Sequence, residues 1–541
     1  MQETFLLCLS LVLGVSLLVM VGQRLRISYP IFLVLGGLAI SFLPGIPPIA
    51  INPELIFLIF LPPLLYEAAW FTSWREFWKW RRVIITFAFG VVIFTAGAVA
   101  LVSNALIPGF TLALGFLLGG IISPPDAVAA TSVFRALPVP RRLVSVVEGE
   151  SLVNDASSLI VFRFALGAVL SGTFVWQDAA TSFVWVTLAG IGVGMGVALV
   201  FYVIHRWIPT TPSIHTVLTL VTPYLMYITA ELAHVSGVMA VVSGGLFLSF
   251  QSTTIFTARN RMQGLHTWAT VGFMLNGLVF ILIGLQLPVI VESLGDYSLK
   301  EAIGYGLVIT LVITVVRMVS ALGTSLFTRF ISRYIRTNDS NPGWRMPFVF
   351  GWAGMRGVVS LASAFSIPLL GSDGQAFPQR NLILFITFMV ILITLVVQGL
   401  TLPIVIRLVH PPDKDGLLPE HEQEAEIQLH LYKAALHRLR DQHSGQISEN
   451  DLVANLEDRL ENDIRLTTQW LEAEECDEHE QEDLNRYHAV FTDLVRAQRR
   501  ELARLRRNGN YDDELLRRQE AQLDLEEERV HQFSSLIAVK S

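Results

Sequence analysis

Residues 118–128 read LGGIISPPDAV and lie inside an apolar run from 110 to 134. Two consecutive prolines, Pro124 and Pro125, remove two backbone donors and clash with the carbonyls of the preceding helical turn. A helix across this run must therefore break here, and Asp126 follows the break directly. Irregular backbone at membrane depth occurs only where it is buried in protein or lines a watery cavity. The stretch therefore predicts a discontinuous membrane helix with a carboxylate at its break.

The composition of the whole chain favours a membrane protein. Of its 541 residues 52% are apolar and only 16% are charged, and the mean hydropathy is +0.53, whereas about 25% of an ordinary soluble domain is charged. Residues 1–410 contain 22 Lys and Arg and 15 Asp and Glu, and residues 411–541 contain 17 and 31. We therefore expect a transmembrane domain at 1–410 and an acidic domain at 411–541. The acidic balance of the second domain argues against nucleic-acid binding.

Other features of the sequence exclude several classes of protein. The two cysteines, Cys8 and Cys476, cannot form a disulfide framework or a metal quartet. The first residues lack the basic start of a secretory signal, so we interpret the first apolar run as a retained membrane span. The phosphate-binding pattern GxxxxGK[ST] does not occur. We expect no cofactor, no ATP and no enzymatic activity, and an ion gradient as the driving force.

Thirteen apolar runs, most of them close to the roughly 20 residues that cross a bilayer, are separated by charge, proline or glycine. They span approximately 4–22, 29–43, 53–70, 83–106, 110–134, 143–170, 180–207, 214–233, 236–250, 265–290, 302–328, 346–370 and 381–409. Alternate connections carry sixteen basic residues on one side and two, Lys300 and Arg380, on the other. Because basic loops stay in the cytoplasm, the C-terminus should be cytoplasmic and the N-terminus outside.

The acidic domain shows helical periodicity at 429–439, 452–464, 484–505 and 515–530. Gly445 and the pair Asn508-Gly509 interrupt these stretches. We expect a small cytosolic helical domain of antiparallel hairpins that regulates the membrane domain. The acidic run 472–483 is interpreted as a solvated face.

Ionisable residues within the predicted spans are candidates for function, because a charge in hydrocarbon costs several kcal/mol. They are Glu67, Asp126, Glu148, Glu150, Asp155, Arg163, Arg317 and Arg356. Glu54, Glu231 and Arg407 lie near span ends, where they can reach water. His205 and His234 also lie near span ends, and we expect no function for them.

The run 143–170 contains a cluster of oxygen-bearing side chains. On a helix Glu148, Ser151 and Asp155 share one face, and Glu150 and Asn154 share the adjacent face. Carboxylate and hydroxyl oxygens suit hard cations. The run 346–370 has three glycines around Arg356, which predicts a second loosened helix. It lies seven spans after the first broken helix, as in two inverted six-helix repeats.

A purely structural interpretation of these charges is the alternative. Asp126 and Asp155 could be neutralised by Arg163, Arg317 or Arg356, although the proline break beside Asp126 would then have no explanation. Arg356 alone favours a structural role, because a guanidinium repels a cation and suits a buried carboxylate. Arg163 and Arg317 also favour structural roles.

Four motifs together resemble a known family. They are LPPLLYE at 61–67, the Pro-Asp pair at 125–126, ESLVND at 150–155 and GMRG at 354–357. In this order they are similar to the sodium/proton exchangers of the first monovalent cation:proton antiporter family, especially its bacterial NhaP-like members. The resemblance covers about Leu6 to Arg407.

The resemblance implies an all-α homodimer of thirteen-span protomers in the cell membrane, with two crossed, discontinuous helices and a role in pH homeostasis. It implies that Asp155 binds either cation or proton, that Asp126 and Ser151 complete a Na+ site, and that Glu67 acts through water. Where relatives often have Thr-Asp-Pro, this chain has Pro125-Asp126-Ala127, so a carbonyl ligand would come from Pro125.

Three other residues receive roles from the resemblance. Asn154 stands where electrogenic relatives have a second aspartate, which implies one-for-one, electroneutral exchange of a monovalent cation (Na+, Li+ or K+) for H+. Glu150 and Arg356 are implied to form an ion pair that braces the core. A cation channel or uniporter would instead show a continuous polar pore, and an organic-solute transporter of the same architecture would favour basic ligands.

Overall fold

The computed structural model describes most of the chain. The described residues are 2–25, 27–43, 53–135, 137, 139–172, 176–295, 297–334, 339, 343–371, 374–412, 420–472, 478–508 and 511–538. Four residues considered in the sequence analysis lie outside them: Arg26, Arg336, Cys476 and Gly509. The side chains of Cys8, Glu54 and the acidic run 472–483 are also outside the described part.

The chain divides into two compact units, Met1–Pro412 and Asp413–Ser541. The division falls where the composition changes, at the step from His410 to Pro412. The transport and regulatory roles expected for the two parts stay predictions.

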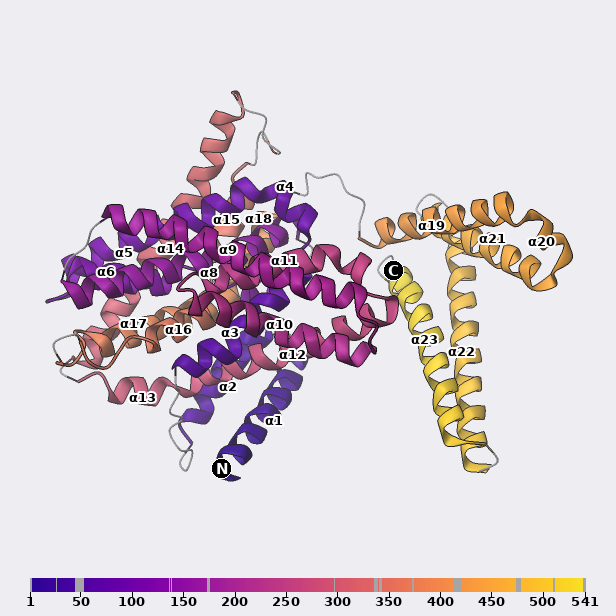
Figure 1. Cartoon of the computed structure of the whole chain (residues 1–541), viewed down its shortest axis with the longest axis horizontal. Coiled ribbons are helices and arrows are strands. Elements are labelled where there is room, and N and C mark those ends of the chain that lie inside the picture. The colour runs from indigo at the N-terminus through magenta and orange to yellow at the C-terminus, as the bar shows by residue number, and fades with distance from the viewer. Residues whose placement is uncertain are drawn as a thin grey trace. The chain divides into compact units, whose positions relative to one another are not determined.

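The first unit is built from helices (Figure 1). They are α1 (Gln2–Arg24), α2 (Tyr29–Ser41), α3 (Pro53–Phe71), α4 (Trp74–Ile85), the π-helical η1 (Thr86–Val91), α5 (Val92–Leu106), α6 (Leu112–Ile122), α7 (Ala127–Phe134), α8 (Arg141–Ser171), α9 (Trp176–Trp207), α10 (Pro212–Leu232), α11 (Gly237–Ile255), α12 (Ala258–Leu285), α13 (Leu287–Glu292), α14 (Leu299–Ile331), α15 (Arg345–Trp352), α16 (Val358–Phe365), α17 (Arg380–Ile393), the π-helical η2 (Thr394–Gln398) and α18 (Gly399–Val409).

The described part of the chain confirms the all-α fold class, since its extended structure is limited to an isolated bridge between Leu370 and Ala376. Each apolar run predicted from the sequence coincides with helix. Among the described residues, eight helical stretches are long and apolar enough to cross a membrane by length and composition. They are Trp74–Leu106, Leu112–Phe134, Arg141–Ser171, Ala180–Trp207, Gly237–Ile255, Ala258–Glu292, Leu299–Ile331 and Arg380–Val409. Thirteen crossings and the inverted repeats stay predictions.

The helix break predicted at the two prolines is confirmed. The α6 helix ends at Ile122, and α7 begins at Ala127. A second break separates α15 from α16 between Trp352 and Val358. Both breaks lie within apolar runs, so each leaves backbone groups that need partners inside the protein.

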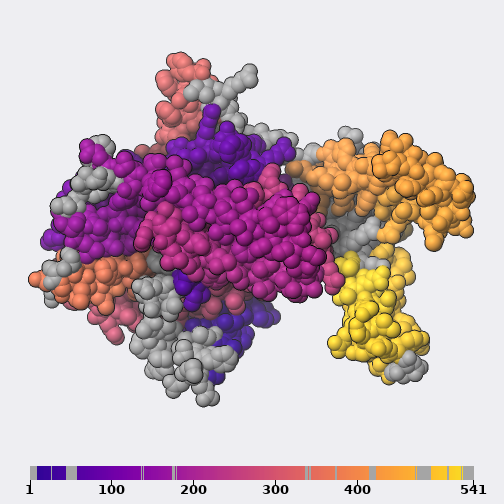
Figure 2. All heavy atoms as spheres, in the orientation of Figure 1, coloured from indigo at the N-terminus to yellow at the C-terminus, as the bar shows by residue number. Residues whose placement is uncertain are grey.

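Two hydrophobic clusters make up the core of the first unit. One gathers buried side chains of α1, α2, α4 to α8 and α12 to α18, and the other gathers those of α3 and α8 to α12. The helices α8 and α12 contribute to both, with Leu152 and Val153 of α8 in different clusters. In Figure 2, α9 and α11 (magenta) cover one face. The broken helix α6–α7 packs on α8, so the site lies where the two clusters meet.

The second unit consists of helices, as its periodicity predicts. They are α19 (Glu420–Gln442), α20 (Ser444–Glu449), α21 (Asp451–Glu472), α22 (Glu478–Asn508) and α23 (Asp513–Ala538). The α19 helix packs on α21, and α22 packs on α23 (Figure 1). Arg499 pairs with Asp524, and Arg506 pairs with Glu520. The later residue of α22 thus pairs with the earlier residue of α23. The pair α22–α23 is therefore an antiparallel hairpin.

Truncation after Pro412 should leave the first unit folded, because both hydrophobic clusters consist of residues before this position. The thermal midpoint in detergent should change by less than about 4 °C, which corresponds to roughly 1 kcal/mol for a large domain. Circular dichroism and size-exclusion chromatography measure this. Truncation after Ile393 is the control: it removes the buried Leu395 and Leu402 and should cause aggregation. Equal aggregation of both proteins would contradict the independence of the first unit.

Candidate functional site

The break between α6 and α7 places Asp126 at the start of a helix. Asp126 has an extended backbone (φ −95°, ψ 124°), and its Oδ1 accepts a hydrogen bond of 2.8 Å from the backbone N–H of Val128. An aspartate in this position satisfies one of the donors that a helix N-terminus leaves free. The carboxylate is half-buried, and its Oδ2 is left for another partner.

The second break meets the first. The backbone N–H of Asp126 donates to the carbonyl of Met355, at 2.8 Å, and the backbone N–H of Arg356 donates to Thr394 Oγ1, at 3.1 Å. Backbone groups that have no partner within a helix at the two breaks thus form hydrogen bonds with other parts of the protein. The two discontinuous helices are therefore joined at their unwound segments.

Two glycines of the GMRG motif make room for charged side chains. A Cβ atom on Gly357 would overlap the carboxylate of Asp126, and one on Gly354 would overlap the side chain of Arg317. Both glycines are thus required by close approach. The sequence indicated a loosened helix here but not which side chains the glycines admit.

The α8 helix braces the first break from the other side. Ser151 Oγ accepts a hydrogen bond from the backbone N–H of Ala127, at 3.1 Å, and Asn154 Nδ2 donates to the carbonyl of Pro125, at 3.1 Å. The carbonyl of Pro125, expected as a cation ligand, thus already accepts one bond and keeps its second lone pair. The Oδ1 atom of Asn154 is buried and has no hydrogen-bond partner among the described residues.

Asp155 is one turn further along α8 from Ser151. Its side chain is buried, and its charge interacts with that of Asp126. None of the described residues donates a hydrogen bond to its carboxylate, and no arginine forms an ion pair with it. The structure therefore brings Asp155, Asp126 and Ser151 to one place, and no cationic side chain among the described residues pairs with the two carboxylates.

Glu67 of α3 and Glu148 of α8 lie at the edge of this site. Both side chains are half-buried, and both interact electrostatically with Arg135 at the end of α7. Glu67 also packs against α12, since a Cβ on Gly272 would overlap its carboxylate. Tyr29 of α2 interacts electrostatically with Glu67 and Asp126.

Three contributors were missed by the sequence analysis. Tyr29 and Thr394 are single polar groups in or beside apolar runs, which was the available signal, and Arg135 was counted only as a loop charge. The carbonyl of Met355 carries no sequence signal, because every residue has one. These contacts depend on how distant segments pack.

The predicted ion pair between Glu150 and Arg356 is wrong. Glu150 instead pairs with Arg317 of α14, whose Nη1 and Nη2 donate to the two carboxylate oxygens at 2.8 Å each. Both side chains are buried. The planar guanidinium reaches both oxygens at once from a continuous helix, a geometry that strengthens such pairs.

Arg356 lies in the unwound segment and is also buried, at 1% exposure. Its Nε and Nη1 have no hydrogen-bond partner among the described residues. It interacts with Glu150 electrostatically but without an ion-pair contact. Arg356 is therefore a buried cation near the Glu150–Arg317 pair and not its member.

The remaining candidates lie apart from the break. Arg163 forms an ion pair with Glu231 at 2.7 Å, and the two side chains are 50% and 33% exposed. Because such exposed pairs contribute about 0–1 kcal/mol, this pair has a small structural effect. The arginines Arg163 and Arg317 are thus engaged elsewhere and do not neutralise Asp126 or Asp155. His205, for which no function was expected, is buried and hydrogen bonds to His215 Nδ1 at 2.8 Å.

Comparisons with known proteins show the family to which the chain belongs. Residues 9–408 match the family model described as sodium/hydrogen exchanger, transmembrane. The chain belongs to this family of multi-pass membrane transporters.

Particular relatives extend this result. A protein named an uncharacterised Na+/H+ exchanger of Mycobacterium tuberculosis is 32% identical over 96% of this chain and 94% of its own length. A Bacillus subtilis protein named a sodium, potassium, lithium and rubidium/H+ antiporter is 34% identical over 68% of this chain and 56% of its length. The solved structure of the antiporter MjNhaP1 from Methanocaldococcus jannaschii has a TM-score of 0.59 at 19% identity, covering 75% of this chain and 98% of that one. Its fold is therefore shared.

Breaking the buried pair on one side should strongly destabilise the protein. Glu150→Gln and Arg317→Met should each lower the unfolding free energy by roughly 3–5 kcal/mol, since each leaves one uncompensated buried charge, and the double variant should lose less than the sum. Unfolding in mixed SDS micelles measures these losses.

Two further cycles serve as controls for this measurement. The exposed pair Arg163→Gln with Glu231→Gln should lose about 0–1 kcal/mol. A cycle of Glu150→Gln with Arg356→Met should show weaker coupling than the cycle with Arg317. Stronger coupling to Arg356 would restore the original assignment of the pair.

Proposed function

We propose that this protein is a secondary antiporter in which a monovalent cation and a proton compete for Asp155 and Asp126. The observation that carries the proposal is the contact of the two unwound segments through the Asp126 N–H to Met355 carbonyl bond. Two carboxylates lie beside it, and no arginine among the described residues pairs with them. Clustered carboxylates disfavour an anion or organic-solute carrier. Membership of the exchanger family favours antiport over a channel or uniporter.

Competition follows from the chemistry of buried carboxylates. A carboxylate held away from water is stabilised by one positive charge, which either a proton or a metal cation can supply. Once one has bound, the second is attracted far less strongly. Each carboxylate pair therefore exchanges one ion for the other instead of carrying both.

The proposed cation site uses oxygen atoms of Asp155, Asp126 and Ser151. Ser151 Oγ accepts a bond from Ala127 N–H, and the hydroxyl oxygen keeps a second lone pair for a cation. Pro125 offers its second carbonyl lone pair, Glu67 is proposed to act through water, and Glu148 is a secondary candidate. Alternating access then requires rocking of one group of helices against the other, around the two helix breaks.

The range of cations in this proposal is broad. The Bacillus relative is named for sodium, potassium, lithium and rubidium. The ligands of this chain are oxygen atoms that accept any alkali cation. We therefore propose Na+ as one of several transported monovalent cations.

Asn154 supports one-for-one exchange. Its amide does not titrate, and its Nδ2 holds the carbonyl of Pro125, a contact that an aspartate could not donate. The site then changes its proton content by one when it exchanges a proton for a monovalent cation. Electroneutral transport is the consequence.

The assembly and location of the protein also belong to this proposal. We infer a homodimer in the cell membrane with the N-terminus outside and the C-terminus in the cytoplasm. The apolar outer face of α9, where Trp185 and Leu188 are 70% and 61% exposed, suits lipid or a second protomer. The acidic second unit would regulate transport, and the process would contribute to pH homeostasis.

Asp155→Asn and Asp126→Asn should each reduce exchange to the level of protein-free vesicles while the protein stays folded. Each change removes the negative charge for which both ions compete. The measurement is cation-induced dequenching of a pH-sensitive dye in proteoliposomes, repeated for Na+, Li+ and K+. In the wild type, the apparent affinity for the cation should fall as the pH is lowered, because protons compete.

Glu292→Gln is the matched control for these variants, because Glu292 is an exposed carboxylate at the end of α13. It should exchange at the wild-type rate. Undiminished exchange by purified Asp155→Asn protein would overturn the assignment of the site.

An imposed membrane potential should leave the initial rate of exchange nearly unchanged. If one net charge crossed the membrane per cycle, each 100 mV would contribute about 2.3 kcal/mol, enough for more than a tenfold change in a rate constant. Because K+ is itself a proposed substrate, a gradient of the membrane-permeant anion thiocyanate sets the potential. Na+ is the transported cation, and a voltage-sensitive dye verifies the potential. A several-fold response would exclude one-for-one exchange.

A further inference from the structure

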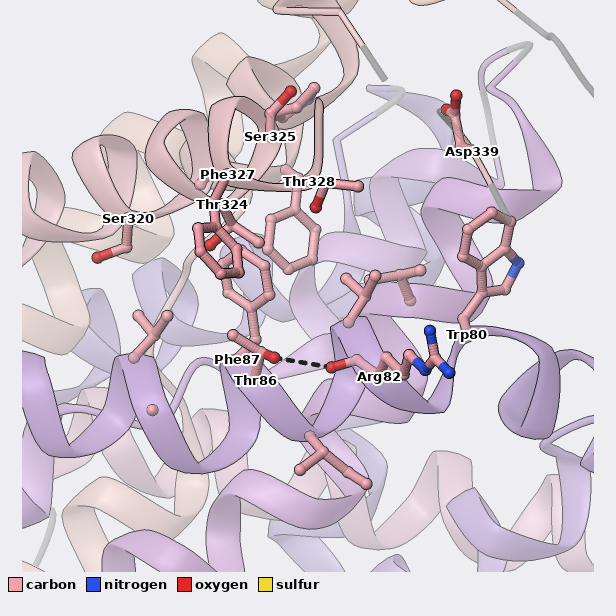
Figure 3. A pocket seen from close by; sticks show the side chains of 18 of the residues that line it. Trp80, Arg82, Thr86, Phe87, Ser320, Thr324, Ser325, Phe327, Thr328 and Asp339 are labelled. Atoms are coloured by element: carbon pink, nitrogen blue, oxygen red, sulfur yellow. Dashed lines mark hydrogen bonds between the residues drawn. The ribbon is translucent and has the colours of Figure 1, made fainter. Parts of the chain in front are cut away.

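A groove of about 950 Å³ lies between two helical segments of the first unit, apart from the carboxylate site. One wall is formed by α4, η1 and the start of α5, and the other by the C-terminal half of α14. Figure 3 shows Thr324 and Phe327 of α14 pointing across the groove toward Thr86 and Phe87. Sites for small ligands have volumes of roughly 300–1,000 Å³, so the groove is large enough for one.

Each wall of the groove has an exposed glycine, which leaves free space where another residue would place a side chain. Gly90 of η1 and Gly323 of α14 line it, and a Cβ atom built on either meets no atom within 4 Å. Apolar side chains surround this opening, and Phe94 and Phe327 are 58% and 61% exposed. At these two glycines the groove is lined by backbone, with apolar side chains around it.

The other end of the groove is basic. Lys79, Arg81, Arg82 and Arg142 line it, together with one acidic residue, Asp339. Arg142 pairs with Asp339, and its guanidinium lies 4.0 Å from the centroid of the Trp80 ring. In Figure 3, Trp80 and Arg82 lie toward one end, and Ser320 lies toward the other. The groove thus has a positively charged end and an apolar end.

We propose that this groove binds an anionic phospholipid, with its phosphate at the basic end and an acyl chain between α5 and α14. A soluble anion would not fill the apolar part of the groove. Although Lys79 lies 3.8 Å from Glu76, the basic side chains at this end outnumber the acidic ones, and the phosphate of an anionic lipid would balance this net positive charge where a neutral lipid would not. Basic pockets between membrane helices on the cytoplasmic side recognise anionic headgroups in this way. Lys79 to Arg82 belong to the connections predicted to face the cytoplasm, where anionic lipid is accessible.

The bound lipid touches side chains that lead to the carboxylate site. Phe350 lines the groove, and its ring centroid lies 4.9 Å from the guanidinium of Arg317, the partner of Glu150. Phe87, also in the groove, packs edge-on against Phe350 with centroids 4.6 Å apart. In η1, the carbonyl of Ala88 accepts a hydrogen bond from Ser157 of α8. Lipid in the groove therefore stabilises the packing of α14 and η1 that braces α8.

Lipid retention by the purified full-length protein tests the proposal without any transport assay. Delipidated protein is mixed with equal amounts of dioleoyl phosphatidylglycerol and dioleoyl phosphatidylcholine, and bound lipid is counted by native mass spectrometry. The wild type should retain at least five times more phosphatidylglycerol than phosphatidylcholine. Gly323→Leu, which fills the groove, and Arg82→Gln, which lowers the charge, should each reduce phosphatidylglycerol retention at least fivefold.

Gly304→Leu is the matched control, because Gly304 is on the same helix, has no atom within 4 Å of its Cβ position and does not line the groove. It should retain lipid like the wild type. Gly90→Leu replaces Gly323→Leu if the latter unfolds in detergent. Equal retention by all variants, or equal retention of both lipids, overturns the proposal. Displacement of the lipid by an equal concentration of glycerol 3-phosphate would also overturn it, since the site would then bind a soluble anion.

Discussion

The hydrogen bond from the backbone N–H of Asp126 to the carbonyl of Met355 joins the two places where the membrane helices unwind. An unpaired backbone group in a dry interior costs several kcal/mol, so a helix break within an apolar run survives only with a partner. Here the first break supplies the backbone N–H group and the second supplies the carbonyl that accepts it. This contact holds the start of α7, where Asp126 lies, beside the segment that leads into α16.

The charged residues near the two helix breaks fall into two groups, one with a charged partner and one without. Glu150 and Arg317 neutralise each other with a bidentate pair between the continuous helices α8 and α14. Asp155 and Asp126 have no such cation among the described residues, and their neighbours Ser151 and Asn154 hold the broken backbone instead. Among the described residues, the broken backbone therefore has hydrogen-bond partners, and the two carboxylates have no cationic partner.

The long helix α14 connects this arrangement to the outer surface. Arg317 faces Glu150 inside the unit, and one to three turns later Gly323 and Phe327 face the groove. Gly354 in the second break allows Arg317 to pass, because a Cβ there would overlap it. A shift of α14 would thus act on the brace and on the groove together. A lipid bound in the groove could therefore act on the Glu150–Arg317 pair through α14.

Much of this protein was determined by the sequence itself. Hydropathy and the two prolines predicted an all-α membrane unit with a broken helix. Both signals depend only on neighbouring residues, so they can be read from the sequence without knowledge of the packing. The spacing of Glu148, Ser151 and Asp155 placed their oxygens on one helix face. The four motifs identified the family.

Only the tertiary structure decided which charges meet. Glu150 and Arg356 looked like partners, yet Arg317, 167 residues away from Glu150, takes that place. Tyr29, Thr394 and the Met355 carbonyl entered the site without a motif, and the lipid groove arose from two walls far apart in the chain. Such contacts depend on the relative position and rotation of packed helices. Local sequence fixes which face of a helix is polar but not which neighbour lies against that face.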